Sequence, residues 1–287
     1  MTLATLRDVL QPAAQHGHAV AGLVVLGWED ALAFAEAAEE TGQPIILQAG
    51  PGSRRHTPVP VLGAMFRHLA EQASVPIVCH IDHARTLDEC REGIDCGFTS
   101  VMFDGSELPI GENIVLTAQI CDEARRAGVS VEGEVGFVGY AEGEASAMTS
   151  VDEAALFDRE SGADAMAISI GNVHLQTEAV ARIDMQRLRA IEAATRMPLV
   201  LHGGSGIPAD IRRALATTSR VCKFNIGTEL RQAFGAALRR SLTDNPRGFD
   251  RIELLKPVIP AIRQETVKVI TGLQAGWARE NTRSNKQ

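Results

Sequence analysis

The sequence has no run of about 18 consecutive apolar residues, so no segment is expected to cross a membrane. Its first 25 residues also lack the charged start and the apolar stretch of a secretion signal. Polar residues interrupt this segment at Arg7, Asp8, Gln11, His16 and His18. These absences predict a cytoplasmic protein without a membrane partner.

Charge and cysteine content exclude two further classes of protein. The formal net charge is −8 and the pI is about 5.5, with acidic residues spread along the chain, so we expect no nucleic-acid partner. The five cysteines form no CxxC pair, and their odd number argues against a disulfide framework. We expect each to be a small buried apolar residue, including Cys79, which lies beside the candidate site described below.

What the sequence does contain is a regular alternation of short apolar runs and longer segments with helical periodicity, which is typical of a parallel sheet. Apolar residues make up 45% of the 287 positions, as in globular proteins. The predicted strands lie at 19–25, 44–48, 76–80, 100–103, 130–133, 165–168, 199–201 and 221–226. The predicted helices lie at 30–41, 58–73, 87–95, 110–127, 151–161, 184–195, 208–217 and 229–241.

Eight such units predict an α/β fold, a (β/α)8 TIM barrel, in a single domain of residues 1–287. A doubly wound open sheet is the main alternative, but no glycine-rich nucleotide-binding motif follows the first strand. A final helical stretch at about 251–277 exceeds what the eighth unit needs. It is expected to be an extension that covers a barrel end or an oligomer interface, and the polar tail after it is expected to be frayed.

Four potential metal ligands lie at or just after the ends of different predicted strands: His83, Glu134, His174 and His202. In a closed barrel these positions converge at one end, where barrel enzymes perform their chemistry. Imidazole nitrogens with a carboxylate suit Zn2+ or another divalent metal, and three ligands leave a position open for substrate. Taken alone, His174 could equally be an ordinary loop histidine.

Asp82 directly precedes His83, so its carboxylate can reach a group that the metal polarises and can move a proton there. The alternative is that Asp82 only orients a histidine.

Glycine-containing loops follow the last two predicted strands. Residues 202–206 read HGGSG and residues 225–228 read NIGT. Backbone N–H groups of such loops, the hydroxyls of Ser205 and Thr228, and the start of the next helix can hold a phosphate. For the first loop alone, a flexible turn is the alternative.

Six segments together resemble the class II fructose-bisphosphate and tagatose-bisphosphate aldolases. They are HIDHARTLDEC (80–90), SVMFDGSELPIGENI (100–114), VSVEGEVGFVG (129–139), IGNVH (170–174), LVLHGGSGIP (199–208) and KFNIGTELRQAF (223–234). The likeness runs in order from about residue 28 to 262. It implies reversible retro-aldol cleavage between C3 and C4 of a ketose phosphate, a bisphosphate or a 1-phosphate, to dihydroxyacetone phosphate and an aldehyde.

The resemblance also implies roles for individual residues. Zn2+ would be held by His83, His174 and His202, with Glu134 as a ligand in an alternative metal position. The acid/base acting on the C4 hydroxyl would be Asp82, and Asp104 would orient or stabilise the intermediate. A second catalytic acid would be Glu142, on the family's mobile loop. The phosphate would be held by Gly203, Ser205, Asn225, Gly227 and Thr228. The family suggests a homodimer or homotetramer.

Several substrate-holding positions depart from the family pattern, which points to a divergent member. Val24 stands where the family has Asn, Gly50 where it has Ser or Thr, and Gly227 where it has Asp, Asn or Ala. Leu175 replaces a glycine and Glu178 replaces a lysine. A negative charge at a buried anion site should weaken phosphate binding. Arg251 is the nearest candidate for the family's basic residue at the distal phosphate.

We therefore expect an aldolase that acts on a ketose phosphate or a related ketose. The changed loops permit a second reading, in which the same chemistry is applied to a nonphosphorylated or carboxylate-bearing substrate. A third is a metal-binding barrel that has lost activity. The presence of Asp82, Glu142 and all four potential ligands argues against the third reading.

Overall fold

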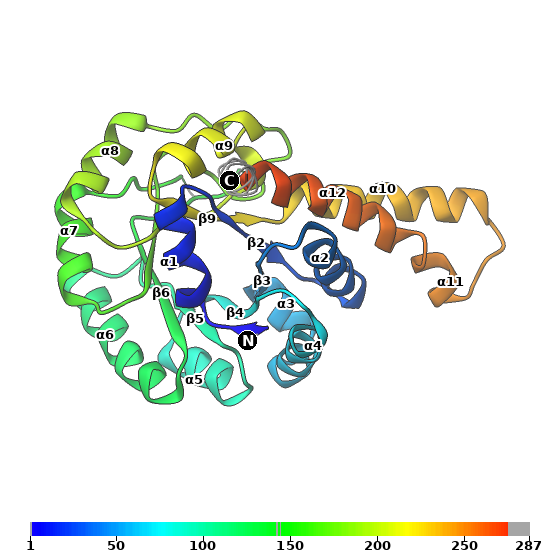
Figure 1. Ribbon diagram of the computed structural model, residues 1–287, viewed down its shortest axis with the longest axis horizontal. Helices are drawn as coiled ribbons and strands as arrows, with labels where there is room; N and C mark the ends of the chain where they lie inside the picture. The colour runs from blue at the N-terminus through cyan, green and yellow to red at the C-terminus, as the bar shows by residue number, and fades with distance from the viewer. Residues whose placement is uncertain (1, 142, 144, 275–287) are drawn as a thin grey trace, which may run out of the picture.

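The computed structural model describes residues 2–141, 143 and 145–274. At its centre eight parallel strands pair in sequence order, and the last pairs with the first, so that the sheet closes into a barrel (Figure 1). The strands are β2 (Val20–Val24), β3 (Ile45–Ala49), β4 (Ile77–Ala84), β5 (Ser100–Phe103), β6 (Ser130–Val135), β7 (Ala165–Ile168), β8 (Leu199–Leu201) and β9 (Val221–Ile226). The predicted barrel is confirmed, and the open-sheet alternative is wrong.

Helices surround the barrel because each strand is followed by a segment with one apolar face. They are α2 (Trp28–Thr41), α4 (Val59–Gln72), α5 (Leu87–Asp95), α6 (Ile110–Ala127), α7 (Val151–Glu160), α8 (Met185–Ala194) and α9 (Ala209–Thr218). Local sequence sets their ends: Thr86 and Glu89 form a capping box at the start of α5, and α6 ends at Gly128, which has φ 71°. Buried apolar side chains fill the layer between strands and helices.

The C-terminal helices differ from the predicted arrangement. The stretch predicted as one helix is interrupted at Lys256–Pro257, which separates α11 (Arg251–Leu255) from α12 (Val258–Leu273). It is α12 that packs against α2, α9 and β2 and so completes the outer ring. The helix predicted for that position, α10 (Thr228–Asp244), instead extends from the barrel with α11 at its tip (Figure 1).

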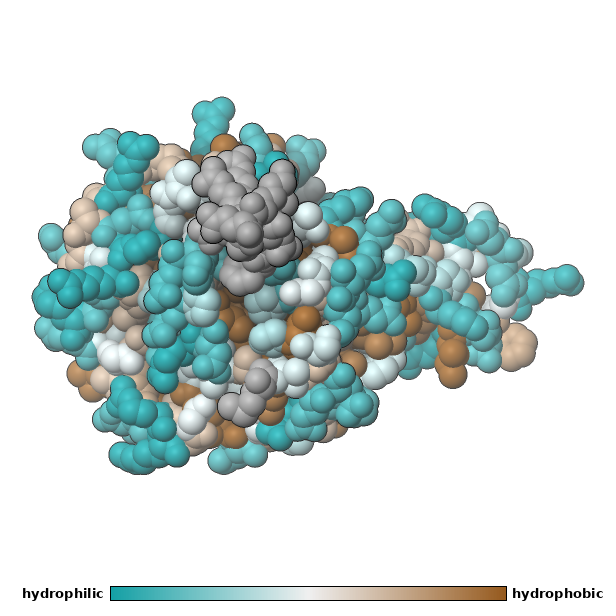
Figure 2. Space-filling view, in the orientation of Figure 1, coloured by the Kyte–Doolittle hydropathy of each residue, from teal (hydrophilic) through white to brown (hydrophobic). Residues whose placement is uncertain are grey.

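This projecting arm carries exposed apolar side chains. Phe249, Ile252 and Leu242 are 94%, 73% and 47% exposed, respectively. Apolar patches are visible among the hydrophilic ones on the surface of the arm in Figure 2. Among the described residues, every helix is too short or too polar to span a bilayer.

The end of the barrel where the strands begin is closed by the first residues of the chain. The short strand β1 (Leu3–Ala4) pairs with the start of β4, and α1 (Leu6–His16) follows it. Leu6, Val9 and Leu10 of α1 pack against side chains inside the barrel, including Val78 and Met102. Neither element was predicted. The open end of the barrel is therefore the one at the strand C-termini.

Candidate active site

The end of β4 places two consecutive polar residues at the open end of the barrel. Neighbouring side chains in a regular strand point to opposite faces, yet Asp82 and His83 line the same cavity. The pairing of β4 with β5 shifts register between Ile81 and Ala84, and His83 has a φ of 53°. This irregularity turns both side chains toward the cavity.

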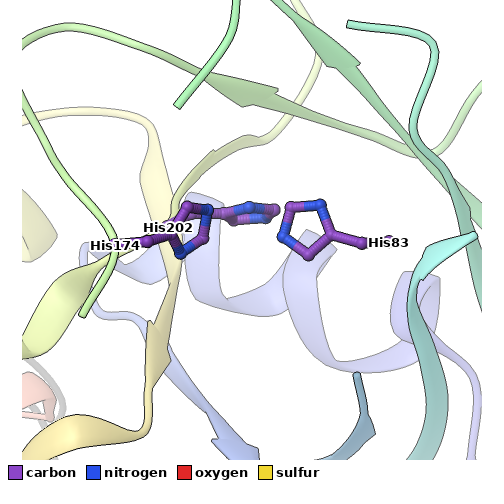
Figure 3. A group of neighbouring side chains, drawn as sticks. All are labelled: His83, His174 and His202. Atoms are coloured by element: carbon purple, nitrogen blue, oxygen red, sulfur yellow. The ribbon is translucent and has the colours of Figure 1, made fainter. Parts of the chain in front are cut away.

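Three histidines meet there, His83 near the end of β4, His202 directly after β8 and His174 in the loop after β7 (Figure 3). One nitrogen each of His83, His174 and His202 lies within 4.8 Å of the others. His83 Nε2, His174 Nε2 and His202 Nδ1 are buried, and no described residue hydrogen-bonds to them. Buried polar atoms are rarely left without a partner. Three such nitrogens at one point fit the donor set of a divalent metal such as Zn2+.

Carboxylates hold two of the imidazoles in the orientation and tautomer that ligation requires. His83 Nδ1 donates to Asp104 Oδ2 at 2.8 Å, and His202 Nε2 donates to Glu132 Oε1 at 3.1 Å. In the neutral form of each ring, the other nitrogen therefore carries the lone pair that metal ligation needs. Glu132 is in turn held by Lys223, whose Nζ donates to Oε2 at 2.6 Å inside the barrel.

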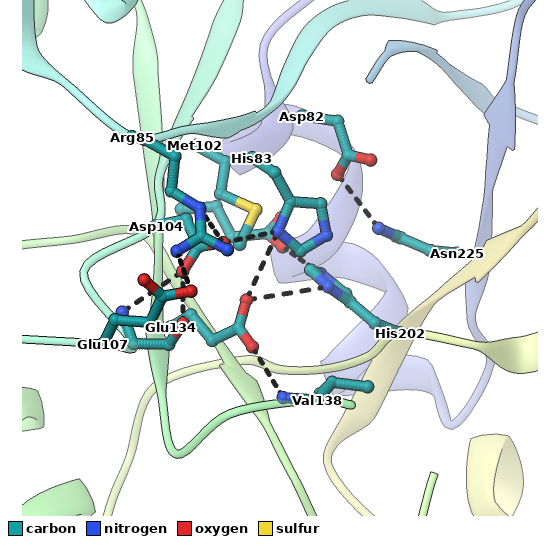
Figure 4. Close-up of polar contacts among 12 residues, drawn as sticks. Asp82, His83, Arg85, Met102, Asp104, Glu107, Glu134, Val138, His202 and Asn225 are labelled. Carbon is teal, nitrogen blue, oxygen red and sulfur yellow. Dashed lines mark hydrogen bonds and ion pairs between the residues drawn. The ribbon is translucent and has the colours of Figure 1, made fainter. Parts of the chain in front are cut away.

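Glu134 lies beside the three histidines, on β6. Its Oε2 is buried without a described partner and lies 3.6 Å from His83 Nδ1 and 3.8 Å from His202 Nδ1 (Figure 4). His83, Asp104 and Glu134 form a second group of potential ligands. Glu134 is thus within reach of an alternative metal position.

The electrostatics of the site favour a cation. Burial, followed by repulsion from the Asp104 carboxylate, raises the pKa of Glu134 well above its ordinary value. Burial also lowers the pKa of His174, so its imidazole is neutral. At His83 burial disfavours the charged form, but the surrounding carboxylates, Asp82 first, outweigh burial and raise its pKa to about 9. The carboxylates therefore favour positive charge beside His83, whereas burial lowers the pKa of His174 and of His202.

Asp82 is held by two amides and does not hydrogen-bond to a histidine in the described structure. Its Oδ1 accepts from Gln48 Nε2 at 3.0 Å. The same oxygen accepts from Asn225 Nδ2 at 3.1 Å (Figure 4). Burial would raise its pKa, but positive charge on neighbouring groups, His83 first, brings the pKa below its ordinary value. Asp82 is therefore an ionised carboxylate that is fixed at the cavity wall and carries no proton of its own.

The cavity has a volume of about 340 Å³ and extends from the histidines to the loops after β8 and β9. These loops bring together all five residues expected at a phosphate: Gly203, Ser205, Asn225, Gly227 and Thr228. The Ser205 hydroxyl oxygen accepts from the backbone N–H groups of Gly227 and Glu229, each at 3.3 Å, so its own proton can be donated to a ligand. Gly203 has φ 62°, and a Cβ there would collide with the Val173 carbonyl.

The departures from the family pattern have different structural consequences. Leu175 keeps a left-handed backbone, with φ 58°, at the position where the family has glycine. Glu178 is exposed and does not line the cavity, so the expected charge on a buried anion site is wrong. Arg251 lies on α11 and lines a second cavity of about 560 Å³, away from the histidines.

A cationic group that the sequence did not reveal lies near the phosphate loops. Arg231, in the first turn of α10, lines the 340 Å³ cavity, and its Nη2 is 3.6 Å from the point where a Gly227 Cβ would stand. Its Nε is buried without a hydrogen-bond partner among the described residues. A cation at a helix N-terminus opposes the helix dipole, so an anion beside it would be stabilising.

Other contacts were also missed by sequence analysis. Gln48, Glu132 and Lys223 are polar residues within strands whose residues are all buried, and a polar residue in a predicted barrel strand was the available signal. Cys79 is buried in the outer layer, and burial raises its pKa to about 12, consistent with the structural role expected for it. Glu142 lies outside the described residues.

Sequence comparison gives the same picture over nearly the whole chain. The profile of the family "Fructose-bisphosphate aldolase class-II" matches residues 4–276. A curated relative, the 6-phospho-5-dehydro-2-deoxy-D-gluconate aldolase of Bacillus licheniformis, is 36% identical over 276 residues, which is 93% of each chain.

Solved structures agree with this match. The YdjI aldolase from Escherichia coli K12 superposes with a TM-score of 0.81 at 28% identity, over 94% of this chain and 97% of that one. The fructose-bisphosphate aldolase of Campylobacter jejuni has the same fold, with a TM-score of 0.81 at 21% identity over 95% of each chain. The chain therefore belongs to the class II fructose-bisphosphate aldolase family and is a retro-aldol lyase.

Proposed function

We propose that the protein is a Zn2+-dependent aldolase that cleaves a ketose phosphate, a bisphosphate or a 1-phosphate, to dihydroxyacetone phosphate and an aldehyde. The observation that carries this proposal is the set of three buried imidazole nitrogens, without partners among the described residues, beside the fixed carboxylate of Asp82. The family is metal-dependent and its substrates are sugar phosphates.

His83, His174 and His202 would hold Zn2+ or another divalent metal, and Glu134 would serve in an alternative position. When bound, such an ion polarises a ketone carbonyl and stabilises the negative charge that cleavage leaves on the ketone fragment. Asp104 and Glu132 would keep two of the imidazoles in the ligating tautomer, supported by their hydrogen bonds to His83 and His202.

Asp82 would remove the proton of the C4 hydroxyl. As the C4–O bond becomes a carbonyl, the electron pair of the C3–C4 bond stays on C3 of the ketone fragment, and the aldehyde leaves. Gln48 and Asn225 support this role because their amides fix the carboxylate. We assign protonation of C3 to Glu142, from the family resemblance.

The phosphate of the ketone fragment would lie on the loops after β8 and β9. The backbone N–H group of Gly203, the hydroxyls of Ser205 and Thr228, and the start of α10 supply donors, and Gly227 lines the same part of the cavity. Arg231 adds a positive charge at the same end of the cavity. Asn225, although bonded to Asp82, also lines this end.

Exchange of carbon-bound hydrogen tests this proposal without knowledge of the aldehyde. Dihydroxyacetone phosphate incubated with the enzyme in D2O should take up deuterium at C3, EDTA should stop the exchange, and Zn2+ should restore it. Exchange with unphosphorylated dihydroxyacetone but not with its phosphate would contradict the phosphate assignment. Bound Zn2+ with neither exchange nor cleavage of any sugar phosphate or free ketose would support the inactive barrel instead.

A carboxylate-bearing substrate is the second candidate, and the 36% identical relative favours it. The gluconate for which that relative is named carries a carboxylate at C1, a ketone at C5 and a phosphate at C6. Retro-aldol cleavage between C3 and C4 would release dihydroxyacetone phosphate and a three-carbon aldehyde with the carboxylate. A higher kcat/KM for fructose 1,6-bisphosphate than for this phosphorylated acid would argue against the second candidate.

The same proposal covers the domain organisation, the oligomeric state and the location of the enzyme. Residues 1–287 would form one domain, supported by the packing of α12 on α2 and α9. A homodimer or homotetramer is supported by the exposed apolar residues of the arm, because large exposed apolar patches often mark interfaces. A cytoplasmic location, with neither membrane nor nucleic acid as partner, fits substrates whose phosphate charge prevents them from crossing a bilayer.

A further inference from the structure

Arg54 lies on a short helix that follows β3 and that the sequence did not predict, α3 (Pro51–His56). Its side chain is only 8% exposed. Nη1 donates to the carbonyl oxygens of Ala49 at 2.6 Å and Asp82 at 2.5 Å, and Nη2 donates to the carbonyl oxygen of His83 at 3.1 Å. One guanidinium thus connects the ends of two barrel strands.

These carbonyl groups lie where the sheet can no longer satisfy them. Ala49 and Ile81 are the last residues paired between β3 and β4, and the pairing of β4 with β5 is irregular from Ile81 to Ala84. The irregularity is also what turns Asp82 and His83 to the same side. Buried carbonyl groups without partners are costly, so this backbone shape needs a donor from outside the sheet.

We propose that Arg54 is a positioning residue that holds the irregular end of β4 and so sets the directions of both the Asp82 carboxylate and the His83 imidazole. The guanidinium suits this task because its planar fork presents several donors at fixed angles. Glu89 lies 3.7 Å from Nη2 and balances the charge. Arg54 is not among the residues that line the 340 Å³ cavity, and the inference rests on the proposed metal site.

Zn2+ affinity, measured by competition with a chromophoric chelator, tests the inference independently of turnover. Arg54→Met keeps an apolar stem but removes the donors, and should weaken Zn2+ binding roughly 10- to 100-fold, the range found for residues that orient metal ligands. The visible spectrum of the Co2+-loaded variant should also change. With any ketose phosphate that the parent cleaves, kcat should fall while KM stays constant, because the phosphate loops are not altered.

Two further variants make the result decisive. Arg54→Lys keeps the charge and much of the volume but lacks the planar fork, so a folded Arg54→Lys should still lose about tenfold or more in Zn2+ affinity. Arg125→Met, which removes an exposed arginine of α6 paired with Asp122, should match the parent in every readout.

Parent-like Zn2+ affinity and kcat in Arg54→Lys would overturn the inference. If Arg54→Met does not fold, Arg54→Lys alone provides the test. His83→Ala, measured in parallel, separates this failure from failure of the metal site itself. Parent-like Zn2+ binding by His83→Ala would reject the metal site, and with it the inference. Loss of binding in His83→Ala, together with parent-like Arg54 variants, would reject the role of Arg54 alone.

Discussion

Asp82 is an ionised carboxylate fixed by two amide donors, and this separates its expected role from that of the metal ligands. Asp82→Asn keeps the shape of the side chain but cannot accept the C4 hydroxyl proton. Cleavage should slow by roughly 10²- to 10⁴-fold, the usual contribution of a positioned general base. Zn2+ content and hydrogen exchange into dihydroxyacetone phosphate should persist, because neither needs that proton transfer. Loss of bound Zn2+ in this variant would contradict the assignment.

Arg231 is the second residue for which the structure predicts a specific effect. Arg231→Met should raise KM for phosphorylated substrates by roughly 10- to 100-fold, since a hydrogen bond from a charged group contributes about 1.5–3 kcal/mol. The kcat value should change little, because the guanidinium lies beside the phosphate loops. Arg239→Met, an exposed substitution on the same helix, is the matched control. An equal effect of Arg231→Met on an unphosphorylated ketose would show that the charge does not contact phosphate.

Several residues of the candidate site can be predicted from the sequence alone. His83, Glu134 and His202 occur at or directly after strand ends, and strand ends of a closed barrel converge. The hydrogen-bond partners of these residues cannot be predicted in the same way, because they depend on which side chains meet across the barrel. Glu132 bonds to a histidine 70 residues away, and Arg54 bonds to carbonyls 28 and 29 residues away.

Among the secondary-structure elements, α1 packs through apolar side chains and lies at the end of the barrel opposite the candidate active site. Leu10 is 1% exposed and packs inside the closed end of the barrel. Leu10→Ala should lower the free energy of unfolding by about 2–5 kcal/mol, through lost burial and the cavity left behind. Denaturant titration measures this, with the exposed Gln11→Ala as control. KM and Zn2+ affinity should be unaffected, and a change in either would show that α1 is coupled to the site.

Two of the elements that sequence analysis missed are short, whereas α1 was missed although its apolar residues have helical spacing. The strand β1 has two residues and α3 has six, with Pro and Gly at its start. In α1 the signal was an apolar face of Leu6, Val9, Leu10 and Ala13 after a capping box at Thr5, and Pro12 interrupts that pattern. Most barrel strands were predictable because both faces are buried and their sequences are short apolar runs, although β4 and β6 also carry polar residues of the site. Which helix would complete the ring was not predictable, because α10 and α12 both carry apolar faces.

For the molecule as a whole, a bound metal should contribute to stability as well as to chemistry. Zn2+ at about 100 times its Kd should add about 2.7 kcal/mol to the free energy of unfolding, because the unfolded chain does not present the three histidines together. EDTA should therefore lower Tm, and added Zn2+ should restore it. Differential scanning calorimetry of the parent and His83→Ala provides the comparison. A similar response to EDTA in His83→Ala would place the stabilising metal elsewhere.

The closure of one barrel end by β1 and α1 also has a practical consequence. Leu3 and Ala4 pair with the first residues of β4, whereas the cavity lies beyond the last residues of that strand. The start of the chain and the entrance for small molecules are thus on opposite sides of the protein. An enzyme immobilised on a solid support through its first residues should leave that entrance facing the surrounding solution.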